Sequence, residues 1–211
     1  MADLEIIGVP QSNYVWTCAI AATEKGLTPR IVPVRAHDGD AAKIHPFGKI
    51  PCMRHGDFTL WESRAILSYI DHAFPGPALA PRDPKGAALV EQWLSAVNTM
   101  IDPVLVRQYM VQYIFPNTPD RQPDRARIEA ALKPMQRCID VLDEAVTATG
   151  HLVGSAFTLA DMNVFPILFY ARRFPESRAM IDAKPALLAY VKTHEARPSV
   201  AAHKPPPMPK G

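Results

Sequence analysis

Strand and helix patterns alternate only in the first third of the chain, and this contrast limits the folds that the sequence can adopt. Residues 4–7 (LEII) form a short apolar run that predicts a buried strand. Apolar spacings of three and four over residues 15–22 predict a helix that stops at Gly26. Residues 31–34 (IVPV) predict a second strand, at a sheet edge because Pro33 lacks a donor. Strand, helix and strand in this order imply a parallel pair with a right-handed crossover.

A hairpin and another helix follow this unit. Two short runs, residues 51–53 and 58–61, flank a Gly-Asp turn and predict an antiparallel pair. The polar residues 35–48 before them leave room for one short helix. After the hairpin, a helix with one apolar face ends before Pro75.

Only helical patterns occur after the proline-rich residues 75–84, which predict a linker. They cover residues 85–114, 123–149, 160–173 and 184–196, and we expect Pro103 and Pro134 to kink or divide two of them. The tail HKPPPMPK predicts an extended segment. We therefore expect an α/β domain at residues 1–76, a linker at 77–86, and an all-helical domain with an extended tail at 87–211.

Composition excludes several classes of protein. The 211 residues are 48% hydrophobic, and 23 basic and 21 acidic side chains leave a net charge of +2. No basic block interleaved with aromatic residues indicates nucleic-acid binding. No apolar run approaches the roughly 20 residues that a membrane helix needs, and the acidic start MADLEIIG is unlike a signal peptide. The three cysteines and the histidines show no metal-binding spacing. We expect a cytoplasmic protein without a metal.

Three stretches each allow a structural and a functional interpretation. In VPQSNYVW, Ser12 either caps the first helix or holds a reacting atom. In HPFGKIPC, Pro51 opens a strand either with the usual trans bond or with a cis bond that turns the Ile50 backbone outward. In WESRAI, Glu62 and Ser63 either cap a helix or form an anion site at its N-terminus. A fourth stretch, FTLADM, has the spacing of a structural capping box.

In combination and in this order, these motifs resemble the cytosolic glutathione transferases. The similarity covers about residues 4–200 and is greatest to the serine-type members, the plant phi class and its bacterial relatives. It implies a thioredoxin-like α/β N-terminal domain, an all-α C-terminal domain, a homodimer and glutathione as cosubstrate. It also implies that Phe47 inserts into the partner subunit.

The same resemblance assigns roles to the residues of the three stretches. It implies that Pro51 is cis, that the Ile50 backbone pairs with the cysteinyl part of glutathione, and that Glu62 and Ser63 hold its γ-glutamyl end. Lys49 is a candidate partner of the glycyl carboxylate, and His37 and Lys43 are further candidates.

The resemblance makes Ser12 the catalytic residue, with Asn13 and Tyr14 as alternative contacts of the sulfur. A thiol with a pKa of about 8.5 is only a few per cent ionised at pH 7. Lowering that pKa by two units requires roughly 2.7 kcal/mol, and one charge-assisted hydrogen bond contributes about 1.5–3 kcal/mol. A hydroxyl at a helix N-terminus can therefore supply much of this stabilisation.

The first loop and the long helix after the linker supply the expected electrophile pocket, with Val9, Pro10, Tyr14, Met100, Tyr109, Met110 and Tyr113 as candidates. The expected activity is conjugation of glutathione to small hydrophobic electrophiles, with possible peroxidase activity. The alternatives are a glutathione-dependent isomerase or dehalogenase, and a non-catalytic binding protein of the same fold.

Overall fold

The computed structural model describes residues 4–207, which divide into two units. The first unit contains the chain up to Arg82 together with the segment that begins at Ala196, and the second contains Asp83–Glu195. Each unit has its own architecture.

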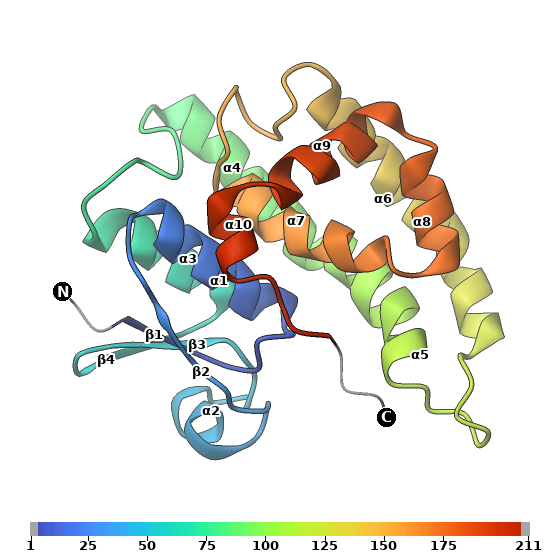
Figure 1. The fold of residues 1–211 in the computed structure, drawn as a ribbon, viewed down its shortest axis with the longest axis horizontal. Helices are drawn as coiled ribbons and strands as arrows, with labels where there is room; N and C mark the ends of the chain where they lie inside the picture. The colour runs from blue at the N-terminus through green and yellow to red at the C-terminus, as the bar shows by residue number, and fades with distance from the viewer. Residues whose placement is uncertain (1–3, 208–211) are drawn as a thin grey trace. The chain divides into compact units, whose positions relative to one another are not determined.

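The first unit is built on a four-stranded sheet with the order β2-β1-β3-β4 (Figure 1). Its strands are β1 (Leu4–Ile7), β2 (Arg30–Val32), β3 (Cys52–His55) and β4 (Phe58–Trp61). β1 pairs parallel with β2 and antiparallel with β3, and β3 pairs antiparallel with β4. These pairings confirm the predicted strand-helix-strand unit, the edge position of the second strand and the hairpin.

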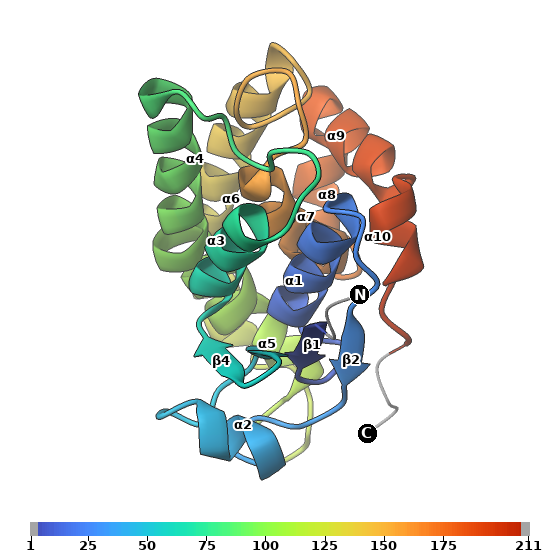
Figure 2. The same ribbon diagram turned by 90° about the vertical axis from the view of Figure 1, so that its left-hand side faces the viewer.

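Helices cover both faces of this sheet. α1 (Asn13–Glu24) and α3 (Ser63–Ala73) pack on one face, and α2 (Gly39–Ile44) lies on the other (Figure 2). Successive side chains of a strand point to opposite faces of the sheet. Ile7 and Cys52 pack with Ala41 of α2 on one face. β1, inside the sheet, is thus buried on both sides, as its short apolar run predicts, whereas β2 and β4 are exposed or half-buried.

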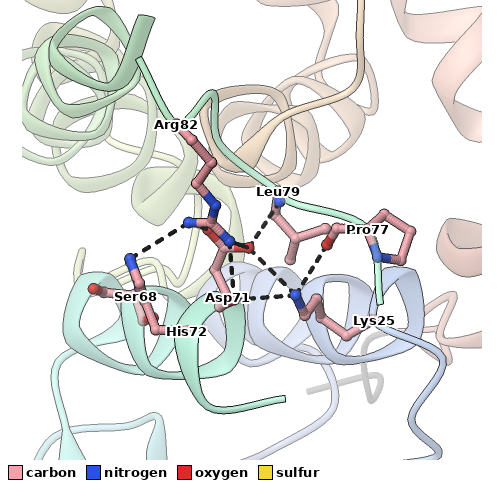
Figure 3. A network of polar contacts seen from close by, with 7 residues as sticks. All are labelled: Lys25, Ser68, Asp71, His72, Pro77, Leu79 and Arg82. Atoms are coloured by element: carbon pink, nitrogen blue, oxygen red, sulfur yellow. Dashed lines mark hydrogen bonds and ion pairs between the residues drawn. The ribbon is translucent and has the colours of Figure 1, made fainter. Parts of the chain in front are cut away.

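The stretch expected as a linker is bound tightly to the first unit. The carboxylate of Asp71, in the last turn of α3, accepts hydrogen bonds from the Leu79 backbone (2.8 Å) and from the guanidinium of Arg82 (2.8 Å) (Figure 3). Lys25, just after α1, donates to the carbonyls of Asp71 (3.0 Å) and Pro77 (2.9 Å). Residues 77–82 are therefore an ordered strap across the ends of two helices, and the next helix already begins at Pro84.

The last described segment also belongs to the first unit. α10 (Pro198–Ala202) packs against α1, where Trp16 donates its indole N–H to the Val200 carbonyl (3.3 Å). Arg197 pairs with Glu24 at 3.0 Å. The sequence analysis places all residues from 87 onward in the helical domain. It misses the return of α10 to α1, because helical periodicity does not show which helix a segment packs against. Residues 203–207 contain no helix, and the rest of the predicted extended tail lies outside the described residues.

The regular elements of residues 83–195 are all helical. They are α4 (Pro84–Ala96), η1 (Val97–Met110), α5 (Val111–Ile114), α6 (Arg125–Thr147), α7 (Leu159–Ala171), α8 (Pro175–Asp182) and α9 (Pro185–Glu195). α7 is buried along its whole length and contacts η1, α4 and α9. Its first turn carries the predicted capping box, in which the Asp161 carboxylate accepts from the Thr158 backbone (2.9 Å) and hydroxyl (3.0 Å).

Neither of the two prolines expected to kink or divide a helix divides one. Pro103 lies inside η1, a stretch of π-type turns that continues to Met110. Pro134 lies within α6, which continues from Arg125 to Thr147. α8 was not predicted, although Pro175 followed by Glu176 is a typical helix start.

Candidate functional site

Strand register brings three separate stretches of the first unit to one end of the sheet. Ile7, the last residue of β1, pairs with Cys52, the first residue of β3. Cys52 also pairs with Trp61, the last residue of β4. The loop after Ile7, the segment before Cys52 and the residues after Trp61 therefore meet at the same edge. A Cβ built on Gly8 would lie 3.1 Å from Cβ of Ile50, so two of these stretches are in close contact.

Ser12 ends the first of these stretches as the N-cap of α1. Its backbone is extended (φ −70°, ψ 126°), and Oγ accepts a long hydrogen bond from the Val15 amide (3.4 Å). The capping interaction uses a lone pair of the oxygen, so the hydroxyl hydrogen stays available for donation. The cap and the functional interpretation of Ser12 are thus compatible.

Asn13 and Tyr14 form the start of α1. Asn13 Nδ2 is buried and has no hydrogen-bond acceptor in the described part of the chain. The Asn13 carbonyl accepts from the Thr17 hydroxyl (3.0 Å), which fixes the backbone of the first turn. Tyr14 is half-buried. Both residues therefore belong to the same first turn that Ser12 caps.

The second stretch contains Lys49, Ile50 and Pro51. The Ile50-Pro51 bond is cis, as the resemblance implied. The Lys49 side chain is exposed, whereas Ile50 is half-buried. His37 contacts this stretch, because its backbone donates to the Gly48 carbonyl and its ring lies where a Gly48 side chain would begin. His37 and Lys49 are thus brought close together, while Lys43 pairs with Asp40 (3.7 Å) on α2.

The third stretch is Glu62 and Ser63 at the start of α3. Glu62 has φ +70°, a backbone conformation that non-glycine residues seldom adopt outside functional or tight-turn positions. Its side chain is 57% exposed, whereas Ser63 is buried. The amides of the first turn of α3 have no partner within the helix, so the site combines backbone donors with a carboxylate whose Oε1 lies 3.7 Å from His45 Nε2.

Aromatic rings border this end of the sheet. His45, Phe47 and Trp61 form a cluster in which His45 and Trp61 are 4.9 Å apart between ring centroids. Phe47 is 65% exposed. His45 and Trp61 were not identified from the sequence; the only available signal was their position beside the HPFG and ES motifs.

In the second unit, Tyr109 and Tyr113 share a polar partner that the sequence analysis missed. Both hydroxyls donate to Oε2 of Glu176, at 2.8 and 2.6 Å, and Arg125 donates to Oε1 (2.7 Å). Burial would raise the pKa of Glu176, but these hydrogen bonds together lower it to about 2. Tyr109 is fully buried and Met110 almost so, whereas Tyr113 is half-buried. Glu176 therefore holds η1, α5 and α6 to the start of α8.

Burial raises the pKa of the two buried cysteines, Cys18 and Cys52. Burial raises the pKa of Cys18 far above its usual range. Burial, with a smaller contribution from Asp40, raises the pKa of Cys52 to about 11.

Within residues 4–207, no group of three or more histidine, cysteine or acidic side chains could hold a metal ion. The same residues contain no helix of the length and apolarity that a membrane crossing requires.

Two family models and several known proteins match this chain. Residues 6–78 match the glutathione S-transferase N-terminal domain, and residues 105–198 match the C-terminal domain of the same family. Glutathione S-transferase 3 of Zea mays is 35% identical over 99% of this chain and 98% of its own length. The solved structure of glutathione S-transferase III in its apo form is 32% identical and covers 99% of this chain and all of its own, with a TM-score of 0.82.

A theta-class glutathione S-transferase from Xanthomonas axonopodis pv. citri, solved with glutathione bound, is also similar. It is 25% identical, with a TM-score of 0.80 over all of this chain and 99% of its own. Its two-domain fold is the one found here: a thioredoxin-like α/β domain and a helical domain. The chain therefore belongs to the glutathione S-transferase family.

Proposed function

We propose that this protein is a serine-type, phi-like glutathione transferase that conjugates glutathione to small hydrophobic electrophiles. One observation carries the proposal: Ser12, the Lys49-Ile50-Pro51 segment and the Glu62-Ser63 pair converge at one end of the sheet. Each of these stretches alone has an ordinary structural explanation. Their convergence supplies a site with a hydroxyl, a cation, free backbone groups and a carboxylate, which matches the groups of glutathione.

The tripeptide would bind in an extended form across the three stretches. The Glu62 carboxylate would pair with the γ-glutamyl ammonium, and the first amides of α3 with Ser63 would receive its carboxylate. The Ile50 backbone would pair with the cysteinyl residue. Lys49 would neutralise the glycyl carboxylate, with His37 beside it and Lys43 as the more distant candidate.

Ser12 would stabilise the thiolate of the bound glutathione. Because its Oγ accepts from Val15 N–H, its own hydrogen can be donated to sulfur, at the positive end of α1. The thiol proton leaves to solvent, the sulfur forms a bond to the electrophilic carbon, and a leaving group departs with its electron pair. Asn13 Nδ2 is buried and has no acceptor among the described residues, which supports Asn13 as a second hydrogen-bond donor to the sulfur.

A mechanism that uses one of the protein's own cysteines as the nucleophile is disfavoured. The raised pKa of Cys52 and of Cys18 keeps both thiols protonated near pH 7, and the position of a catalytic cysteine is occupied by Ser12. Peroxide reduction by the bound glutathione thiolate would use the same Ser12 site.

The remaining roles stay predictions of the family resemblance. Pro10, Tyr14, Tyr109, Met110 and Tyr113 are the candidate electrophile residues. The exposed ring of Phe47 supports a homodimer in which it contacts the partner, and we expect the protein in the cytoplasm.

The test measures thiolate formation and turnover separately. Wild type should bind glutathione in calorimetry, show the ultraviolet absorbance of a bound thiolate, and conjugate chlorodinitrobenzene. Ser12→Ala should lower turnover by about 100-fold or more while glutathione still binds. Asp83→Ala is the matched control, because it removes an N-cap hydrogen bond (2.9 Å) at α4, far along the chain from Ser12. Its turnover should stay close to that of wild type.

Other outcomes identify the alternatives. Glutathione binding without turnover on a panel of electrophiles would indicate a binding protein. Activity confined to maleylacetone or to halogenated substrates would indicate an isomerase or a dehalogenase. Full turnover in Ser12→Ala would contradict the serine-type assignment.

A further inference from the structure

His45 is a buried side chain whose backbone and ring are both fixed. It is 3% exposed and follows the last turn of α2, where its amide donates to the Ala41 carbonyl (2.9 Å). Its carbonyl accepts from the Gly48 amide (2.8 Å). The ring lies against Trp61 and Phe47, at centroid distances of 4.9 and 5.9 Å. It therefore cannot turn freely.

The hydrogen bonds of the ring define where its proton sits. Nδ1 accepts from the Phe47 backbone amide (3.1 Å), so this nitrogen carries no hydrogen. The neutral ring then carries its hydrogen on Nε2. Nε2 lies 3.7 Å from Oε1 of Glu62, a separation at which the N–H dipole attracts the carboxylate without a full hydrogen bond.

Glu62 is well placed to be oriented by this contact. Its backbone is held at φ +70° and its carboxylate is 57% exposed, so an exposed part of the group faces away from the buried ring. A carboxylate has about four acceptor positions, so contact with His45 leaves acceptors for an incoming ammonium. An unrestrained exposed glutamate would lose rotamer freedom on binding that ammonium.

We propose that His45 is a positioning residue for glutathione binding: its neutral Nε2–H holds the Glu62 carboxylate in the orientation that receives the γ-glutamyl ammonium. This inference rests on the proposed function and adds a residue to it. Lys49 and Glu62 are the charged groups that act on the ring, and Phe47 and Trp61 enclose it. His45 touches no reacting atom, so its effect falls on glutathione affinity and not on the chemical step.

Two substitutions separate the two nitrogens of His45. His45→Gln places an amide donor near the position of Nε2, whereas His45→Asn places an acceptor near that of Nδ1. His45→Asn should weaken glutathione binding by about tenfold, the usual effect of losing one interaction with a charged group. His45→Gln should stay within about threefold of wild type. In both variants kcat at saturating glutathione should stay close to wild type.

A glutathione analogue that lacks the γ-glutamyl amine tests the mechanism directly. His45→Asn should bind this analogue as wild type does, because the ammonium that Glu62 receives is missing. Glu62→Gln combined with His45→Asn should be no weaker for glutathione than Glu62→Gln alone. Thermal unfolding of each variant shows whether it is folded at the assay temperature.

Each contrary result has a distinct meaning. If His45→Gln binds more weakly than His45→Asn, or if His45→Asn weakens the analogue and glutathione equally, His45 only supports the loop and the inference is wrong. If wild type does not bind glutathione in calorimetry, the proposed function fails, and this inference fails with it.

Discussion

Lys25 Nζ lies 3.5 Å from Asp71 Oδ1, and the side chains are only 2% and 0% exposed (Figure 3). This buried pair joins the ends of α1 and α3 to the strap of residues 77–82. Removing one partner of such a pair leaves an uncompensated charge. We expect Asp71→Asn to lower the free energy of unfolding by about 3 kcal/mol in urea titration.

Arg82→Gln is the control for this prediction. Arg82 also bonds Asp71 but is 52% exposed, so water replaces the lost contact and the change should stay near 1 kcal/mol or less. Equal losses of unfolding free energy in Asp71→Asn and Arg82→Gln would show that the buried Lys25 ammonium does not determine the effect of Asp71→Asn.

Gly48 and Gly56 form a matched pair for the glutathione site. Both have positive φ, +63° and +59°. A Cβ on Gly48 would collide with the His37 ring, whereas a Cβ on Gly56 would meet nothing within 4 Å. Gly56→Ala should therefore cost only the backbone strain, about 1–2 kcal/mol. Gly48→Ala should cost more and also weaken glutathione binding about tenfold, measured by calorimetry. Equal glutathione binding by Gly48→Ala and Gly56→Ala would show that His37 does not contribute to the glutathione site.

Glu176 should make the second unit sensitive to acid. Its pKa is about 2 against an ordinary value of 4.5, so it stabilises the fold above about pH 4.5 and loses that contribution as the pH falls toward 2. Glu176→Gln should be less stable than wild type by about 2 kcal/mol near neutral pH, and the difference should shrink over this range. Urea unfolding at several pH values measures it; a constant difference would contradict the prediction.

Tyr109 and Tyr14 should respond differently to loss of the hydroxyl. The Tyr109 hydroxyl donates to Glu176 and accepts from the Ser177 amide (3.2 Å). Tyr109→Phe should therefore lower stability by about 1–3 kcal/mol. Tyr14→Phe should mainly change relative kcat/KM values across electrophiles. Altered electrophile preference in Tyr109→Phe, with unchanged stability, would show that the Tyr109 hydroxyl acts on the electrophile and not through Glu176.

His203 should loosen the C-terminal segment as the pH falls. Its Nε2 lies 2.8 Å from the Thr23 hydroxyl, and burial lowers its pKa. The neutral ring therefore stabilises the docked segment above about pH 6.5, and that contribution is lost as the pH falls through the lower folded pKa. Amide exchange protection in α10 should drop between about pH 7.5 and about pH 5.5 in wild type, and much less in His203→Gln. Equal drops would exclude His203 as the cause.

Local patterns in the sequence determined the elements and the class of fold. The apolar run of β1, the helical spacing of α1 and the Gly-Asp turn between β3 and β4 each act through neighbours in the chain. The motifs around Ser12, Ile50-Pro51 and Glu62-Ser63 identified the family. These features could be predicted because each depends on a few adjacent residues.

Only the tertiary structure decided how distant residues meet. The register Ile7–Cys52–Trp61 brings three motifs to one edge, and α10 returns to α1 across more than half of the chain. Three side-chain pairs bring together residues that no pattern in the sequence relates: Lys25–Asp71, His45–Glu62 and Tyr109–Glu176. Hydrogen bonds and charge pairs act over a few ångströms in space, so the sequence supplied their chemistry while the packing of helices on the sheet selected the partners.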